Sequence, residues 1–333
     1  MTADESRLLQ RHLPALTGRL LLVNPPADDF PLRLQQAGAH VRVFHQQLAA
    51  ARTLQAQGIE VEHDAWLTQA GEVDRILLWQ MKSQPWHGLL LAMLQAAIDH
   101  ETPLWLVGAK RTGIRGGIRR LSQHGSDVQV LDKARHCTLA QVRLQPCPGS
   151  LESHYSRCEV RVAGRELAWY SLPGVFAHGR LDAGSRMLLE HLPPKLDGRV
   201  LDYGAGAGVL AMHVQQQGLG SEWVLLEPDA LARACARRNL PEARVVAGTA
   251  LADVEGRFDW VVSNPPFHQG QARDLDVALQ LIRQAPHRLH RGGGLLLVAN
   301  RHLPYHQPLA SAFDRVEVLA ENNHYRLYLG TVT

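Results

Sequence analysis

The chain alternates short, mainly apolar runs with longer stretches in which apolar residues recur every three or four positions. Short strands without polar alternation are typical of a parallel sheet that helices cover on both faces. The second half of the chain therefore predicts a doubly wound α/β sheet that ends in an antiparallel pair, Val316–Ala320 and Tyr325–Val332. The expected strands are Arg199–Tyr203, Glu222–Glu227, Ala243–Ala247, Trp260–Ser263 and Leu295–Ala299, and the expected helices are Val209–Gln217, Leu231–Asn239 and Leu275–Leu289.

The first half repeats this pattern. In both halves a histidine follows the Leu of the penultimate apolar run by five residues, as His136 and His324. We predict two tandem Rossmann-like α/β domains that arose by duplication, each a mostly parallel sheet with an antiparallel end. The matching segments are Arg19–Asn24 with Arg199–Asp202, Asp74–Trp79 with Asp259–Ser263, Leu104–Arg111 with Leu295–Arg301, and Val128–Leu131 with Val316–Leu319.

The N-terminal copy differs where strands of such a sheet end. Asn24-Pro25-Pro26-Ala27 follows its first run without a glycine turn, and Gln80-Met81-Lys82-Ser83 follows the Asp74 run. We therefore expect a degenerate N-terminal domain, residues 1–150, that binds RNA and supports its neighbour. A linker around Cys147–Ser156 would lead to the catalytic domain, residues 157–333.

Composition narrows the class of protein. The 333 residues are 45% apolar, which is enough for two packed domains and excludes a disordered chain. The most apolar stretch, Gly88–Ile98, is too short to cross a membrane, and Met1–Arg11 does not resemble a secretory signal. The four cysteines form no C-x-x-C pair, so neither a zinc ribbon nor a disulfide framework is expected. These features predict a cytoplasmic protein without a structural metal.

The charge is distributed unevenly. The net charge is +3, and the excess lies in the first half, where no acid occurs between Thr102 and Ser126. Lys110 is followed by Arg111, Arg115 and Arg119. The three arginines are four residues apart, which would place them on one face of a helix. Such a face is either a solvated surface or a set of phosphate contacts.

A glycine-rich turn follows the Arg199–Tyr203 run. Gly204, Gly206 and Gly208 form a G-x-G-x-G pattern after Asp202, and Val209 stands where the dinucleotide fingerprint requires glycine. Glycines let the backbone approach a ligand closely. Glu227, 25 residues after Asp202, ends the next strand, where an acid can accept hydrogen bonds from two ribose hydroxyls. Together they predict a nucleoside cofactor, and they argue against an oxidoreductase.

The most discriminating motif is Asn264-Pro265-Pro266-Phe267, directly after the Trp260 run. The prolines fix the backbone, so the Pro265 carbonyl can lie beside the Asn264 side-chain oxygen. Two adjacent acceptors suit the two hydrogens of an amino group, and Phe267 can stack on a planar base. The motif predicts chemistry on an –NH2 group.

These residues, with the segment Leu172–Leu189, resemble the ribosomal RNA small subunit methyltransferase C family, which are class I S-adenosylmethionine-dependent guanine-N2 methyltransferases. The similarity spans the whole chain. It implies a guanine target in 16S rRNA of the assembled small subunit, S-adenosylmethionine (AdoMet) as cofactor, and a monomeric enzyme. One departure is the segment Ala247–Leu251, which lacks the acid or Asn that many such enzymes place near the adenine.

The candidate residues follow from the motifs and the resemblance together. We expect Asn264, Pro265 and Phe267 to be catalytic. The cofactor site is predicted to contain Asp182, Asp202, Gly204, Gly206, Gly208, Glu227, Thr249, Ala250 and Asn264. RNA contacts are expected from Phe176, His268, Lys110, Arg111, Arg115 and Arg119, with His178 and His268 as polar lining and not bases.

Other functions fit parts of the same pattern. The Asn-Pro-Pro motif also suits adenine N6, a guanine N2 in 23S rRNA or a protein glutamine, because it recognises an amino group and not a particular base. A non-catalytic RNA-binding or assembly factor is a further alternative, which the intact glycine turn disfavours.

Overall fold

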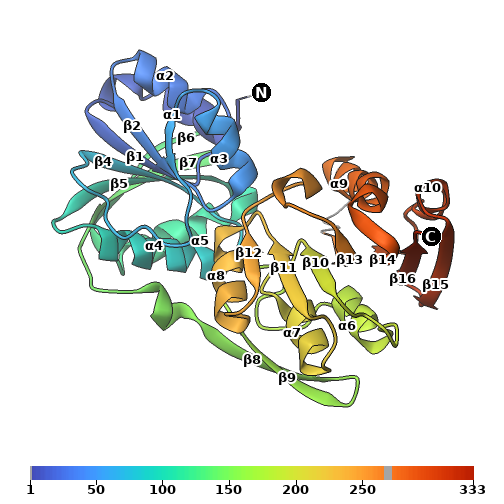
Figure 1. Ribbon diagram of the computed structural model, residues 1–333. Coiled ribbons are helices and arrows are strands. Elements are labelled where there is room, and N and C mark those ends of the chain that lie inside the picture. Colours follow the sequence, from blue (N-terminus) through green and yellow to red (C-terminus); the bar gives the residue numbers. More distant parts are fainter. Residues whose placement is uncertain (1, 266–271) are drawn as a thin grey trace. The chain divides into compact units, whose positions relative to one another are not determined.

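The computed structural model describes residues 2–265 and 272–333, so Phe267 and His268 lie outside the described residues. The chain divides into two compact units, Met1–Tyr155 and Ser156–Thr333 (Figure 1). Each unit contains a seven-stranded sheet, and the strands follow the same order in both. The predicted plan of two tandem Rossmann-like sheets is therefore confirmed.

Unit 1 has the order β3-β2-β1-β4-β5-β7-β6, with β7 antiparallel to both of its neighbours. Its strands are β1 Arg19–Val23, β2 His40–Phe44, β3 Glu60–Glu62, β4 Arg75–Trp79, β5 Thr102–Ala109, β6 Gly125–Ala134 and β7 Cys137–Leu144. Its α-helices are α1 Asp4–Gln10, α2 Phe30–Gln36, α3 Leu48–Gln55, α4 Gln84–Ala97 and α5 Ile114–Leu121, and its 3-10 turns are η1 Leu13–Ala15, η2 Lys110–Thr112 and η3 Leu151–His154.

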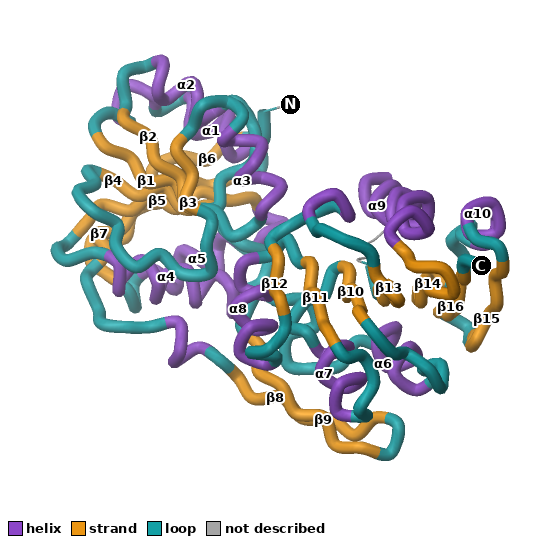
Figure 2. Tube along the Cα trace, in the orientation of Figure 1, coloured by secondary structure: helices purple, strands orange, loops and turns teal. Residues whose placement is uncertain are grey.

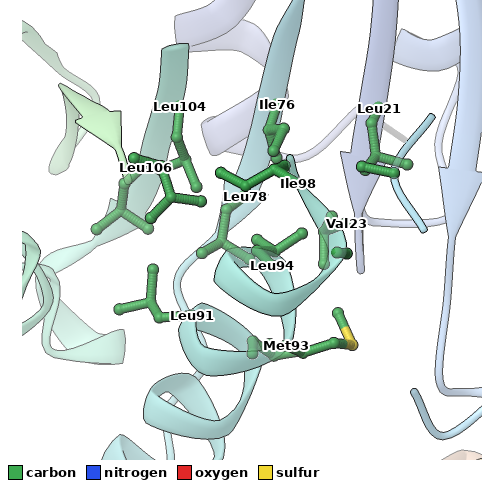
Figure 3. Close-up of a cluster of buried hydrophobic side chains, with 14 of the residues drawn as sticks. Leu21, Val23, Ile76, Leu78, Leu91, Met93, Leu94, Ile98, Leu104 and Leu106 are labelled. Atoms are coloured by element: carbon green, nitrogen blue, oxygen red, sulfur yellow. The ribbon is translucent and has the colours of Figure 1, made fainter. Parts of the chain in front are cut away.

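The central strands β1, β4 and β5 of unit 1 are buried on both faces, which explains their continuous apolar runs. Alternate residues of β1, β4 and β5 pack against α4 and α5, as Figure 3 shows for Leu78, Leu106 and Leu94. The intervening residues of the same strands pack against α1, α2 and α3 on the opposite face of the sheet. This period of two is what a strand dictates, because successive side chains point to opposite faces.

Unit 2 opens with a hairpin, β8 Ser156–Val162 and β9 Arg165–Ser171, and continues into a sheet of order β12-β11-β10-β13-β14-β16-β15. The sheet strands are β10 Arg199–Tyr203, β11 Glu222–Leu226, β12 Arg244–Val246, β13 Phe258–Ser263, β14 Leu289–Asn300, β15 Arg315–Glu321 and β16 Tyr325–Thr331. The helices are α6 Ala183–Glu190, α7 Val209–Gln216, α8 Ala230–Asn239, α9 Ala272–Gln284 and α10 His306–Ala312, with 3-10 turns η4 Leu251–Asp253 and η5 Ala285–Arg288. Figure 2 shows α9 and α10 on one side of the sheet, with α6, α7 and α8 on the other.

Each unit contains the same kind of backbone hydrogen bond at the start of its own sheet. The Asp74 carboxylate accepts a hydrogen bond from the Arg19 N–H at 2.7 Å, and Asp259 accepts one from the Arg199 N–H at 2.7 Å. The same contact at the same place in both sheets supports the predicted duplication.

Three local predictions are wrong. The helix expected to end at Leu289 ends at Gln284, because Pro286 cannot continue the ladder of backbone hydrogen bonds. The strand expected over Leu295–Ala299 begins at Leu289 as β14, and it includes Gly292 with a φ of +80°. Lys110–Arg119 is not one helix: Gly113, with a φ of +79°, separates Lys110 and Arg111 in η2 from Arg115 and Arg119 in α5.

Candidate active site

The glycine turn lies at the carboxyl end of β10. Gly204, Gly206 and Gly208 have φ values of +74°, +56° and +77°, which residues with a Cβ rarely adopt. A Cβ at Gly204 or Gly206 would meet no atom within 4 Å, so this backbone borders open space. β10 and β13 are neighbours in the sheet, and the chain order reverses between them, which is where ligands bind in such folds.

Glu227 follows β11 beside this turn and is 7% exposed. Its Oε2 accepts a hydrogen bond from the Gly206 N–H at 2.7 Å, and its Oε1 accepts one from the Asp229 N–H at 2.8 Å. Burial, and then the nearby Asp229 carboxylate, raise the pKa of Glu227 to about 7. Each carboxylate oxygen has two lone pairs, so one acceptor position remains on each oxygen.

Asp202 is fully buried in β10. Neither of its carboxylate oxygens has a hydrogen-bond partner of normal geometry within residues 2–265 and 272–333. Burial, and then the charge of Glu227, raise the pKa of Asp202 to about 8, while the Ala211 N–H offsets part of that shift. A buried carboxyl group without a partner is costly unless it is protonated or a ligand supplies the donor.

The raised pKa of Asp202 predicts a dependence of stability on pH. The folded protein holds this proton up to about pH 8, whereas the unfolded chain releases it near 3.8, so the free energy of unfolding falls as the pH rises between these values. Asp202→Asn should therefore give a ligand-free protein whose melting temperature falls less between pH 5 and pH 8. Asp197→Asn, at an exposed position of the same unit, is the matched control. Equal pH slopes in the two variants would contradict this account of Asp202.

Asn264 follows β13 with a fixed amide orientation. Its Nδ2 donates to Asp182 Oδ2 at 2.8 Å and to Ser185 Oγ at 2.9 Å. Asp182 in turn caps α6, because the same Oδ2 accepts from the Gly184 and Ser185 N–H groups at 2.9 and 3.2 Å. Both Nδ2 hydrogens are used, so Oδ1 is the atom of the amide that can accept a hydrogen bond from a ligand.

Glycine is required where α6 meets Asn264. A Cβ at Gly184 would lie 3.1 Å from both Asn264 Oδ1 and Asp182 Oδ2, closer than most real contacts. Ser263 adds a second fixed point, since its Oγ donates to the Tyr203 carbonyl at 2.8 Å and joins the ends of β13 and β10. The acceptor Oδ1 is thus held by contacts from two strands and one helix.

These groups line one hollow. Phe176 is 49% exposed at its rim, in the loop that leads to α6. His178 in the same loop contacts Ser171 Oγ through Nδ1 at 3.0 Å, and burial lowers its pKa. The lining residues are Trp169, Phe176, Ala177, Arg180, Leu181, Asp182, Ser185, Gly204, Ala205, Gly206, Ala207, Val209, Leu210 and Asn264.

The structure brings part of the predicted site together at this hollow. Asp182, Gly204, Gly206, Phe176 and Asn264 line it. Asp202 lies within β10, and the other predicted cofactor residues of unit 2 follow β10, β11 and β12 along the same edge: Gly208, Glu227, Thr249 and Ala250. Pro265 lies directly after Asn264 and is buried.

Sequence reasoning missed several lining residues. Ser185 accepts a hydrogen bond from the Asn264 amide. The sequence feature that could have indicated it is its position three residues after Asp182 in the Leu172–Leu189 segment. Trp169 comes from the β8–β9 hairpin, for which no pattern stood out.

Thr249 and Ala250 follow β12 and are held by a nearby acid. Their N–H groups donate to Asp253 Oδ2 at 2.7 and 3.1 Å, and the Thr249 carbonyl accepts from the Tyr203 hydroxyl at 2.8 Å. Asp253 lies just beyond Ala247–Leu251, so an acid is present at this loop although that segment contains none.

Unit 1 has different side chains at the matching edge. Strand register places His45 and Trp79 where unit 2 has Glu227 and Asn264. Burial lowers the pKa of His45 to about 4. Gln46 Oε1 accepts from the Asn24 amide at 3.1 Å and from Trp86 Nε1 at 2.7 Å, so large side chains occupy this edge.

The residues described contain no group of three His, Cys, Asp or Glu side chains that could hold a metal ion. Among the helices of residues 2–265 and 272–333, none is long and apolar enough to cross a membrane.

Comparison with known proteins identifies the class. Residues 166–329 match the Methyltransferase small domain family, and residues 6–155 match the family described as Methyltransferase small domain N-terminal. The chain belongs to the ribosomal RNA small subunit methyltransferase C family: it is 33% identical to the member from Hahella chejuensis (strain KCTC 2396), over 98% of both chains. It is 35% identical to the member from Pseudomonas entomophila (strain L48), again over 98% of both chains.

A solved structure of similar architecture is the T. thermophilus 16S rRNA N2 G1207 methyltransferase (RsmC) in complex with AdoMet and guanosine. The TM-score is 0.84 at 27% identity, over 99% of this chain and 92% of that one. The predicted family and the predicted duplicated fold are both confirmed.

Proposed function

We propose that the chain transfers a methyl group from AdoMet to the exocyclic N2 of a guanine in 16S rRNA. The observation that carries the proposal is the fixed Asn264 amide, which lines the hollow beside the glycine turn and has both Nδ2 hydrogens bound. The names of the family members and the AdoMet and guanosine of the T. thermophilus complex support the same reaction.

The residues present fit AdoMet. Its ribose hydroxyls are donors that match the two acceptor positions left on Glu227. Its ammonium group is a donor that would suit Asp202, whose carboxylate oxygens have no partner of normal geometry among the residues that the structure describes. Gly204 and Gly206 leave space for close approach. When bound, AdoMet supplies an electrophilic methyl group on a sulfonium centre, and the protein supplies position and electrostatics.

Asn264 and Pro265 act on the nitrogen that is methylated. The N2 lone pair of guanine is delocalised into the ring, which makes the nitrogen a poor nucleophile. Asn264 Oδ1 and the Pro265 carbonyl accept the two amine hydrogens, favour a pyramidal nitrogen and aim its lone pair into the hollow. The N–H becomes acidic as the new bond forms, so no strong base is required, and His178 remains polar lining.

The target base must reach this hollow. A guanine in folded RNA has to be unpaired or flipped out before its amino group is accessible. Phe176, half-exposed at the rim, offers an aromatic face for stacking, and Phe267 and His268 directly follow the motif in sequence. Asp182 positions Asn264 and caps α6, so it acts through that residue.

Ribosomal RNA from cells that lack the protein tests the proposal. Primer extension and nucleoside mass analysis should show the loss of one N2-methylguanosine from 16S rRNA. Loss of an N6-methyladenosine, or of a 23S rRNA modification, would assign the site to another amine. Unchanged rRNA together with a hypomethylated protein glutamine would contradict an RNA substrate.

Unit 1 is proposed to be a degenerate copy that supports unit 2 and holds RNA. Its matching edge is filled by Trp86 and Gln46, so we assign one cofactor site per chain, in unit 2. Lys110, Arg111, Arg115 and Arg119 are exposed on η2 and α5. We propose that they contact phosphates, and that the enzyme acts as a metal-free monomer on assembled small subunits in the cytoplasm.

Reversing three of these charges tests the role of unit 1. Arg111→Glu, Arg115→Glu and Arg119→Glu together should weaken binding to small subunits and reduce the log–log salt slope by roughly 0.7–0.9 for each lost contact. AdoMet affinity and melting temperature should stay unchanged. The matched triple lysine variant keeps the charges and should keep the slope. Unchanged salt dependence in the glutamate variant would make this face a solvated surface only.

A further inference from the structure

A second hollow lies in unit 2 where β14 ends and β16 begins. We call it the β14 corner. Asn322 shapes its turn, because its Oδ1 accepts from the N–H groups of His324 and Tyr325, both at 2.8 Å. The Arg301 N–H donates to the His324 carbonyl at 2.8 Å and joins the two walls. The residues that line the corner are Asn300, Arg301, His302, Asn323, His324 and Tyr325.

Among the residues that line the corner, Arg301 is the charged one, and it shares its acidic partner with a second arginine. Arg301 Nε pairs with Glu321 Oε1 at 2.7 Å, and the same carboxylate pairs with Arg326 at 2.9 Å. The hydrogen bonds from Arg326 lower the pKa of Glu321, so two guanidinium groups share one ionised acid. The Arg301 side chain remains 51% exposed, and the imidazoles of His302 and His324 add N–H donors. A guanidinium group with neighbouring N–H donors suits the oxygens of a phosphate group.

The corner lies on the edge of the sheet that carries Asn264. β13 and β14 are parallel neighbours with Ser263 opposite Leu297, so the end of β14 lies one strand from the motif. α6, which Asp182 caps, packs against both β14 and β16. Burial and the Asp182 charge raise the pKa of Tyr325, which agrees with this proximity. A chain that presents a base to Asn264 therefore passes close to the corner.

Unit 1 has basic residues at the corresponding place. Asn300 pairs with Tyr325 at the end of β14, and Ala109 pairs with Cys137 at the end of β5. The Lys110 N–H donates to the His136 carbonyl at 3.0 Å, as Arg301 does to His324. Unit 1 has no glycine turn and carries Trp79 where unit 2 has Asn264, yet this position keeps its positive charge. The cationic corner is therefore separable from the cofactor site.

We propose that the β14 corner binds a phosphodiester group of the RNA that adjoins the target guanine. This inference rests on the proposed function of the same unit. Arg301 supplies the charge, while His302 and His324 supply donors that fix the position of the phosphate. Such a contact positions the target nucleotide and does not read the sequence.

Arg301→Gln tests the proposal in the full-length enzyme. We expect the KM for 16S rRNA substrate to rise roughly tenfold and the log–log salt slope of RNA binding to fall by about 0.7–0.9. The kcat, AdoMet affinity and melting temperature should stay unchanged. Arg301→Lys should restore the salt slope, because the slope depends on the number of positive charges that contact phosphates.

Arg315→Gln is the matched control, since Arg315 is an exposed arginine paired with Glu317 at 3.0 Å at the opposite end of the β15–β16 pair. The same KM and slope in Arg301→Gln and Arg315→Gln would overturn the inference. So would an Arg301→Lys variant as impaired as Arg301→Gln, because the role would then be structural. A wild-type enzyme that methylates no RNA overturns the proposed function and this inference together.

Discussion

Replacing Asn264 by alanine is expected to lower kcat at least about a hundredfold while AdoMet affinity changes by less than about tenfold. The variant loses Oδ1, the acceptor that we assign to the target amine, and also releases Asp182 and Ser185 from the amide. The glycine turn and Glu227 do not contact this side chain and should still bind cofactor. Single-turnover methylation and calorimetry with AdoMet measure the two quantities separately.

Ser185→Ala is the matched control for this prediction. It removes one of the two acceptors that orient the amide and leaves Oδ1 in place, so kcat should fall less than in Asn264→Ala. The order of the two variants distinguishes chemistry from positioning. An Asn264→Ala enzyme that loses AdoMet binding as strongly as turnover would contradict the role of Asn264 as the acceptor for the amine.

Glu227→Ala is expected to have the opposite effect. Hydrogen bonds to a charged group contribute about 1.5–3 kcal/mol each, so the loss of the two bonds from the ribose hydroxyls should weaken AdoMet binding at least about a hundredfold. It also removes the partner of the Gly206 N–H and loosens the turn. At saturating AdoMet, kcat should be nearly unchanged, because Glu227 does not contact the reacting atoms.

Glu222→Ala, at the exposed start of the same strand, is the control for Glu227. That residue pairs with Arg199 at 2.8 Å, far along β11 from the turn, and its removal should leave AdoMet affinity unchanged. Equal cofactor loss in Glu227→Ala and Asn264→Ala would refute the division of roles between the two residues.

The strands and the turn were predictable because their chemistry is local. Apolar runs between glycines and polar residues have few alternatives to buried parallel strands, as in Arg199–Tyr203 before Gly204. The Arg–Asp hydrogen bond that begins each sheet repeats because Arg19 and Arg199 both stand first in their apolar runs.

The contacts that position Asn264 could not be predicted, because they join segments far apart in sequence. Asp182 and Asn264 are separated by 82 positions, and only the fold brings the cap of α6 against the end of β13. In Lys110–Arg119 the four-residue spacing indicated one helix, but the left-handed Gly113 ended it. Arg111 therefore does not share a helix with Arg115 and Arg119, although their spacing is helical.

Methylation by the purified protein tests the central claim most directly. Small ribosomal subunits and free 16S rRNA from cells that lack the protein would be incubated with AdoMet carrying a labelled methyl group, and the RNA digested for nucleoside mass analysis. We predict label in N2-methylguanosine from 16S rRNA, at one site per subunit, and none with Asn264→Ala. Label in N6-methyladenosine, or no label in RNA with an enzyme that binds AdoMet, would contradict the account.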